Sequence, residues 1–179
     1  MLLREVRETD LSAVAEMIDD FVKGHPAENH PRSLGKLRTA YLGDKRVANL
    51  LVAIRREHVV GMVQWSLLYD QFWAMFGVHA EWLYVRPEAR GLGIAAAMIA
   101  DVCARARRTG AEFLRGGANS DALAQLYGRF AIGGPAYECH VSAEAFQVFA
   151  DLAGKPVREI VRGLPARELG RVPPRPREL

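Results

Sequence analysis

The sequence has few cysteines and no long apolar run among its 179 residues. Its two cysteines, Cys103 and Cys139, each lie within an apolar segment, and neither has the C-x-x-C or Cys/His spacing of a metal site, so we expect buried reduced thiols and no metal. No run approaches the roughly 18 to 20 apolar residues of a membrane span, and the N-terminus lacks the features of a signal peptide. We therefore expect a soluble, cytoplasmic protein with no membrane partner.

A large excess of one charge is also missing from most of the chain. The net charge is +3, but the segment 155–179 has seven Lys or Arg against three acids, which leaves residues 1–154 at −1. The body therefore has no electrostatic footprint for nucleic acid, and we expect no nucleic-acid partner. Binding of nucleic acid through the basic tail is the alternative, which deletion of residues 163–179 would test.

What is present is a globular composition, with half of the residues apolar and a quarter charged. Hydrophobic periodicity and turn residues predict the order β-α-α-β-β-β-α-β-α-β-α, a mixed α/β class with a mostly antiparallel central sheet and one crossover unit. The expected strands are 2–7, 49–55, 59–69, 78–85, 112–116 and 135–141, and the expected helices are 11–21, 33–41, 90–109, 121–130 and 143–153.

The segment with the clearest chemical signal is 81–95, which reads EWLYVRPEARGLGIA. A strand ends, a short polar loop follows, and a glycine-containing turn opens a long helix. Free N–H groups and the helix dipole favour an anion at such a turn, and glycines let a phosphate approach the backbone closely. Arg90 adds a full positive charge, so the predicted ligand group is a phosphate or pyrophosphate.

The same residues formally match the dinucleotide pattern G-x-G-x-x-A, but two features disagree with it. Five residues separate the end of the strand at Val85 from Gly91, whereas the dinucleotide turn follows its strand at once. In addition, the acid Glu112 stands before the next strand and not at its end. Two glycines that merely shape a strand-to-helix turn are the other alternative.

The run RGLGIA at 90–95 resembles the R/Q-x-x-G-x-G/A signature of the GCN5-related N-acetyltransferase (GNAT) family, and the preceding strand end and the order of elements from Leu2 to about Val141 are similar to that family as well. The resemblance implies an acyl-CoA N-acyltransferase fold and acetyl-CoA as co-substrate. It implies pyrophosphate binding by Arg90, Gly91, Leu92, Gly93, Ile94 and Ala95, and pantetheine along Leu83, Tyr84 and Val85.

A second segment resembles the family between Asn119 and Ile132, with two departures. Asn119 lies one residue too far from Tyr127, which leaves Ser120 in the position of the family's CoA-binding Asn, and Ala131-Ile132 replaces the usual Gly-Phe. The resemblance implies that Tyr127 protonates the departing thiolate of CoA and that Ser120 lies at the cofactor.

Acetyl transfer to an amine also requires removal of a proton, because an amine of pKa about 10.4 is protonated at pH 7. We nominate Glu81 as the base: the run 81–90 resembles, at the same spacing, the segment with the proposed base in spermidine/spermine acetyltransferases. Strand alternation would place His79, Glu81, Leu83 and Val85 on one face, with the carboxylate among apolar neighbours. An acid that reaches solvent or pairs with an arginine is the alternative, and His79 is a lesser candidate.

The aromatic segment 69–76 lies where the family builds its acceptor pocket, and it is either a pocket wall or plain core. The expected organisation is an acetyltransferase domain over 1–141, a helical extension over 142–162 and a Pro/Arg-rich tail over 163–179. The extension's apolar residues need cover from the body or from a second subunit, which suggests a homodimer. The predicted function is transfer of acetyl from acetyl-CoA to a primary amine of a small molecule or peptide; the alternative is a non-catalytic CoA-binding or partner-binding module.

Overall fold

The computed structural model of the chain describes residues 1–23, 28, 30–72, 74–117, 132–133 and 138–163. Seven strands form one sheet in the order β1-β2-β3-β4-β5-β7-β6, and every neighbouring pair is antiparallel except β4 and β5. The strands are β1 (Leu2–Glu5), β2 (Asn49–Arg55), β3 (His58–Asp70), β4 (Met75–Val85), β5 (Phe113–Gly117), β6 (Ile132–Gly133) and β7 (Glu138–Ser142). The predicted class, a mixed α/β fold with a mostly antiparallel sheet, is confirmed.

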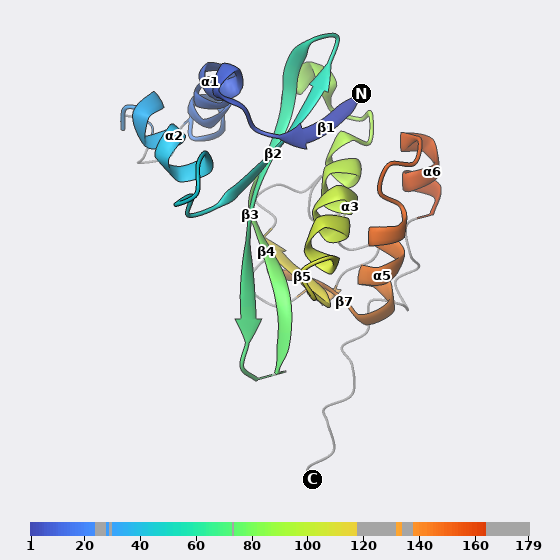
Figure 1. Cartoon of the computed structure of the whole chain (residues 1–179). Coiled ribbons are helices and arrows are strands. Elements are labelled where there is room, and N and C mark those ends of the chain that lie inside the picture. The colour runs from blue at the N-terminus through green and yellow to red at the C-terminus, as the bar shows by residue number, and fades with distance from the viewer. Residues whose placement is uncertain (24–27, 29, 73, 118–131, 134–137, 164–179) are drawn as a thin grey trace.

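Helices cover both faces of this sheet (Figure 1). One face packs against α1 (Leu11–Phe21) and α2 (Leu34–Tyr41), and the other against α3 (Ile94–Arg107), α5 (Ala143–Asp151) and α6 (Val157–Arg162). The predicted helix at 121–130 lies outside the described residues. Two hydrophobic cores result, one on each side of the sheet, and β4 contributes to both of them.

The short helix α2 begins where its sequence predicts. The hydroxyl of Ser33 accepts a hydrogen bond from the backbone N–H of Lys36 at 3.4 Å and so caps the first turn. At the start of α1, Asp10 ends a short 3₁₀ turn, and its carboxylate accepts a hydrogen bond from the backbone N–H of Arg7 at 2.7 Å. Arg4 donates to the same carboxylate, which ties β1 to the beginning of α1.

Helix α3 is the central element of the second core. Nine of its residues are buried, because one side packs on the sheet and the other contacts α5 and α6. Small residues such as Ala97 and Ala100 allow this close approach, and Gly61 on β3 leaves room for Met98, whose Cε would lie 3.2 Å from an added Cβ. Cys103 is fully buried and unpaired, as predicted; the side chain of Cys139 is not described.

The helical extension packs into the body of the protein. Phe146 and Phe149 of α5 are fully buried in the core that also contains Met98 and Leu114. The body of the same chain therefore covers the apolar residues for which a second subunit was one alternative. The homodimer, like the boundary between residues 141 and 142, stays a prediction.

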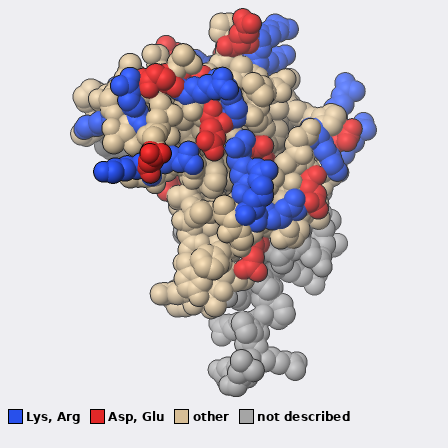
Figure 2. Space-filling view, viewed as in Figure 1, with Lys and Arg blue, Asp and Glu red and all other residues tan. Residues whose placement is uncertain are grey.

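The hairpin formed by β3 and β4 is longer than the sequence predicts. Pairing continues to Asp70 opposite Met75, so both ends of the aromatic segment 69–76 belong to strands, and the hairpin projects from the rest of the fold (Figure 1). On the face shown in Figure 2 this projection is largely free of charged side chains, while Lys and Arg are interspersed with Asp and Glu over the described parts above it. Period-two alternation and the absence of a breaker before Gln71 could have predicted the extra strand residues.

Candidate functional site

Strand β4 contains a bulge where it pairs with β3, and the extra residue of the bulge is Glu81. Gln64 lies opposite Trp82, but the next residue, Trp65, lies opposite Ala80, so Glu81 has no partner on β3. A bulge of this kind bends a strand and increases its twist. The described pairing of β4 with β5 on its other side also ends at Ala80. Among the described residues, no strand therefore pairs with residues 81–85 on the side of β5. An unpaired strand edge can accept an extended ligand through backbone hydrogen bonds.

The bulge changes which residues share a face of the sheet. Strand alternation predicted that His79, Glu81, Leu83 and Val85 lie on one face, and this is wrong across the bulge. Leu83 and Val85 belong to the core on the α3 side of the sheet. Glu81 instead contacts polar side chains of β3 on the opposite side, where Met62 of the same strand belongs to the core with α1. An added residue reverses the side-to-side pattern of everything beyond it, and no rule of single-sequence periodicity locates that residue.

Glu81 is exposed, and its carboxylate is held by two side chains of β3. The amide of Gln64 donates to Oε2, and the hydroxyl of Ser66 donates to Oε1 at 3.4 Å. The predicted apolar neighbours are thus replaced by hydrogen-bond donors. These two contacts orient the carboxylate, and the residue remains exposed.

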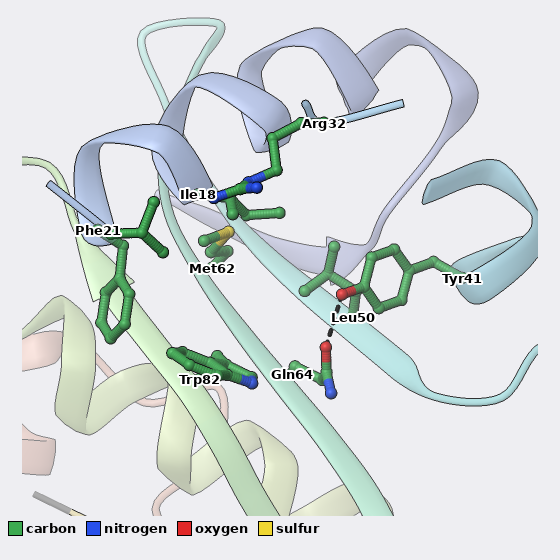
Figure 3. A pocket seen from close by; sticks show the side chains of 9 residues that line it. Ile18, Phe21, Arg32, Tyr41, Leu50, Met62, Gln64 and Trp82 are labelled. Carbon is green, nitrogen blue, oxygen red and sulfur yellow. Dashed lines mark hydrogen bonds between the residues drawn. The ribbon is translucent and has the colours of Figure 1, made fainter. Parts of the chain in front are cut away.

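A third residue extends this network to α2. The hydroxyl of Tyr41 donates to Oε1 of Gln64 at 2.6 Å, so Gln64 is fixed between Tyr41 and Glu81 (Figure 3). Burial raises the pKa of Tyr41 above its usual value, and the negative charge of Glu81 raises it further. Sequence reasoning missed Tyr41 and Gln64, because 23 positions separate them and neither belongs to a motif.

The glycine turn after β4 has the geometry expected of an anion site. Gly91 and Gly93 both adopt left-handed conformations, with φ of +73° and +74°, and Gly93 is the N-cap of α3. An added Cβ on Gly91 would meet no described residue within 4 Å, so no described part of the chain covers that side of the turn. On Gly93 it would lie 2.4 Å from Cγ1 of Val157, so that side is covered by α6.

Arg90 belongs to the turn and not to the helix, because α3 begins at Ile94 and not at the predicted residue 90. Its Nε donates to the carbonyl of Val85 at 3.0 Å, and its guanidinium lies 5.6 Å from the centre of the Tyr84 ring. Arg90 therefore closes the turn onto the end of β4 and brings its charge there. Leu92, Ile94 and Ala95 complete the predicted phosphate-binding segment.

The three residues predicted to lie along pantetheine differ in the side of the sheet on which their side chains are buried. Leu83 is half-buried and Val85 buried against the core of α3, and Tyr84 is buried on the opposite face, with its ring edge-on to Phe21 at 6.1 Å. Ser120 and Tyr127, the two other predicted site residues, lie outside the described residues.

A pocket of about 260 Å³ lies beside Glu81 on the face covered by α1 and α2 (Figure 3). Its walls are the apolar side chains of Ile18, Phe21, Val22, Leu50, Met62 and Trp82, together with Arg32, Tyr41 and Gln64. The predicted aromatic residues 69, 72 and 76 do not line it; they are exposed near the tip of the hairpin, where Asp70 pairs with Arg115. The aromatic wall is formed instead by Phe21 and Trp82, whose rings meet edge-on at 4.9 Å.

The part of the chain that the structure describes has neither a metal-binding cluster nor a membrane-spanning helix. Among the described residues, no three His, Cys, Asp or Glu side chains gather as a metal site would require. None of the described helices combines the length and the apolar character that crossing a membrane demands.

Comparisons with known proteins place these features in context. The model of the acetyltransferase (GNAT) family matches residues 14–131. The structure of a transcriptional regulator from Bacillus halodurans C-125 is 25% identical, has a TM-score of 0.64, and covers 75% of this chain and 93% of its own. No curated protein matches the sequence significantly.

Two acetyltransferase structures share the fold at lower identity. A ribosomal-protein-alanine N-acetyltransferase from Brucella melitensis biovar Abortus 2308 has a TM-score of 0.61 at 20% identity, over 75% of this chain and 94% of that one. An N-acetyltransferase from Thermoplasma acidophilum, solved in complex with coenzyme A, has a TM-score of 0.60 at 14% identity, over 79% of this chain and 98% of that one.

Proposed function

The chain belongs to the acetyltransferase (GNAT) family, and on that premise we propose that it transfers the acetyl group of acetyl-CoA to a primary amine of a small molecule or peptide. The observation that supports this most directly is the position of Glu81. It is the bulged residue of β4, next to the end of the described pairing of β4 with β5, and its hydrogen-bond partner Gln64 lines the apolar pocket.

The residues of the turn and of β4 fit an acyl-CoA. The open side of Gly91 and the first N–H groups of α3 suit a pyrophosphate, and Arg90 adds positive charge. The free edge of residues 81–85 suits the amide-containing pantetheine arm, which can hydrogen-bond to backbone groups as an added strand does. When bound, the cofactor supplies an acetyl group activated as a thioester.

Glu81 would accept the proton of the acceptor ammonium. For an amine of pKa about 10.4, deprotonation at pH 7 costs about 4.6 kcal/mol, so a positioned carboxylate or a water held by it lowers the barrier. The neutral nitrogen then attacks the acetyl carbon, the carbon–sulfur bond breaks, and the sulfur takes a proton. Tyr127 is our candidate for that last step, on the resemblance alone.

Two measurements test the proposal. Acetyl-CoA at 100 times its dissociation constant should stabilise the protein by about 2.7 kcal/mol, or roughly 5 to 10 °C in melting temperature. Release of CoA in the presence of a panel of primary amines should then exceed hydrolysis without an amine. A shift with NADPH but none with acetyl-CoA would overturn the proposal, and binding without transfer to any amine would favour a non-catalytic CoA-binding module.

A further inference from the structure

Two side chains that line the pocket also belong to the hydrogen-bond chain that ends at Glu81. Tyr41 is the last residue of α2, and Gln64 lies on β3 beside the bulge. Figure 3 shows the two side chains pointing toward one another from these elements. They therefore connect the pocket to the group proposed to deprotonate the acceptor, although the acetyl transfer proposed above uses neither of them.

The direction of these hydrogen bonds follows from the groups at the two ends of the chain. A side-chain amide has a donor end and an acceptor end of nearly the same shape, so shape alone does not orient it. The nitrogen of Gln64 faces Glu81, because a carboxylate oxygen only accepts, and the hydroxyl of Tyr41 donates to Oε1 of Gln64 at 2.6 Å. Burial and the charge of Glu81 both raise the pKa of Tyr41 above its ordinary value of about 10, so the hydroxyl stays a donor at neutral pH.

Glu81 depends on this chain because its own position in the sheet holds it loosely. It is the bulged residue of β4, it is exposed, and its long side chain can adopt many rotamers. The hydrogen bonds described for its carboxylate come from Gln64 and, at 3.4 Å, from Ser66. A base must lie within hydrogen-bond reach of the proton that it takes, so a carboxylate that rotates freely would be misplaced for part of the time.

We propose that Gln64 and Tyr41 are positioning residues for Glu81: the amide of Gln64 holds the carboxylate in place for the acceptor amine, and the hydroxyl of Tyr41 holds that amide in the required orientation. This inference rests on the proposed acetyl transfer with Glu81 as base. Because α2 contributes the hydroxyl and β3 the amide, the orientation of the base depends on how α2 packs against the sheet. An acceptor that fills the pocket would contact both side chains, and neither would take its proton.

The test compares Gln64→Met and Tyr41→Phe with the wild type, in the full-length protein with acetyl-CoA and phenethylamine, or with the fastest amine of the panel where phenethylamine is not used. Gln64→Met removes the donor to Glu81 and should lower kcat by about 10- to 10²-fold at pH 7, with a much smaller change in KM. Tyr41→Phe leaves the amide but removes its support, so its loss should be smaller, about three- to tenfold. Both deficits should shrink as pH rises toward the pKa of the amine, because the free amine needs no base.

Double variants separate this role from a general effect on the fold. In the Glu81→Gln protein, the further change Gln64→Met should cost little, because the carboxylate that it positions is gone. Tyr41→Phe should likewise add little to Gln64→Met. Gln147→Met on α5 and Thr39→Ala on α2, both at exposed residues, are the matched controls for the loss of an amide and of a hydroxyl, and both should leave kcat unchanged. Circular dichroism checks that each variant folds.

Three results would overturn the inference while the proposed acetyl transfer stands. They are full activity of both single variants at pH 7, deficits that stay constant across pH, and a loss from Gln64→Met that is as large in the Glu81→Gln protein as in the wild type. Full activity of Glu81→Gln itself would remove the base and with it the inference. Release of CoA by the wild type with none of the amines would overturn both the inference and the proposed function.

Discussion

At the scale of single residues, the site depends on how Glu81 is held. Its carboxylate is exposed, and hydrogen bonds from Gln64 and Ser66 fix its orientation. A base that acts on an ammonium group needs both, because proton transfer occurs only within hydrogen-bond reach. The residue type was predictable from a resemblance; its hydrogen-bond partners were not, because they come from a neighbouring strand.

We predict that Glu81→Gln lowers kcat/KM by about 10²- to 10⁴-fold at pH 7, in the range of general-base contributions. The deficit should shrink as pH rises toward the pKa of the acceptor, because the free amine then becomes abundant without a base. Affinity for acetyl-CoA, measured by calorimetry, should be nearly unchanged. Glu57→Gln, an exposed change in the β2–β3 turn, is the control. A deficit that stays constant across pH would contradict the role as base.

Asp10 is the other carboxylate whose surroundings allow a prediction. Burial alone would raise its pKa, but hydrogen bonds from Arg4 and from the N–H of Arg7, with the charge of Arg4, outweigh burial and hold the pKa below its ordinary value. A carboxyl of lowered pKa stabilises the fold above its unfolded pKa of about 3.9, and this stabilisation is lost as pH falls through the lower folded value.

Asp10→Asn should therefore destabilise the protein by about 1 to 3 kcal/mol at pH 7, because Arg4 and the N–H of Arg7 lose their charged acceptor. The difference between variant and wild type should diminish at the acidic end of a series of urea titrations from pH 7 to pH 2.5. Asp44→Asn, on an exposed loop residue, should show no such difference. A penalty for Asp10→Asn that persists unchanged at pH 2.5 would show that its charge is not the cause.

At the scale of elements, the glycine turn and α6 form one unit. The two glycines look alike in the sequence and share the left-handed conformation, but their surroundings differ: Gly91 faces open space and Gly93 faces Val157 and Val161. A motif predicts the backbone geometry that both need. It does not predict that a helix some 65 positions later lies against one of them, because that contact depends on tertiary packing.

We predict that Gly93→Ala destabilises the protein more than Gly91→Ala. Both substitutions force a side chain into a left-handed conformation, at about 1 kcal/mol, and only Gly93→Ala adds the clash with Val157. The double variant Gly93→Ala/Val157→Ala should recover part of the loss. The measurement is the midpoint of urea unfolding for the four proteins. Equal losses for both glycines would contradict the packing of α6 on the turn.

At the scale of the whole molecule, the sequence predicts the helices and strands better than it predicts the contacts between them. Periodicity and capping residues place α1, α2, α3 and most strands, because each pattern is local. The bulge at Glu81 and the burial of α5 depend on contacts with other elements, which no local pattern reports. For the same reason the left-handed geometry of the glycine turn follows from its motif, whereas the walls of the pocket, which come from several elements, follow no local pattern. An acceptor-binding role of the aromatic segment 69–76 stays a prediction.

The burial of α5 leads to a prediction about cooperativity. Phe149 is fully buried between α5 and the central core, so Phe149→Ala should cost about 3 to 5 kcal/mol. If 1–141 and the extension form one folding unit, tryptophan fluorescence and far-ultraviolet circular dichroism should still report coincident transitions in urea. Phe72→Ala, at a side chain that is 87% exposed, should have little effect. An early transition confined to part of the helical signal would instead favour a separate extension.

The surplus residue in β4 has a consequence for how the site could be gained or lost. The described pairing of β4 with β5 ends at Ala80, directly before the extra residue of β4 in the bulge opposite β3. Substitution at position 81 can remove the carboxylate and still leave the bulge in place. Deletion of one residue there would instead restore regular pairing of β3 with β4. The bulge thus depends on the number of residues in this part of β4, so we expect it to tolerate single substitutions and to be lost when one residue is deleted.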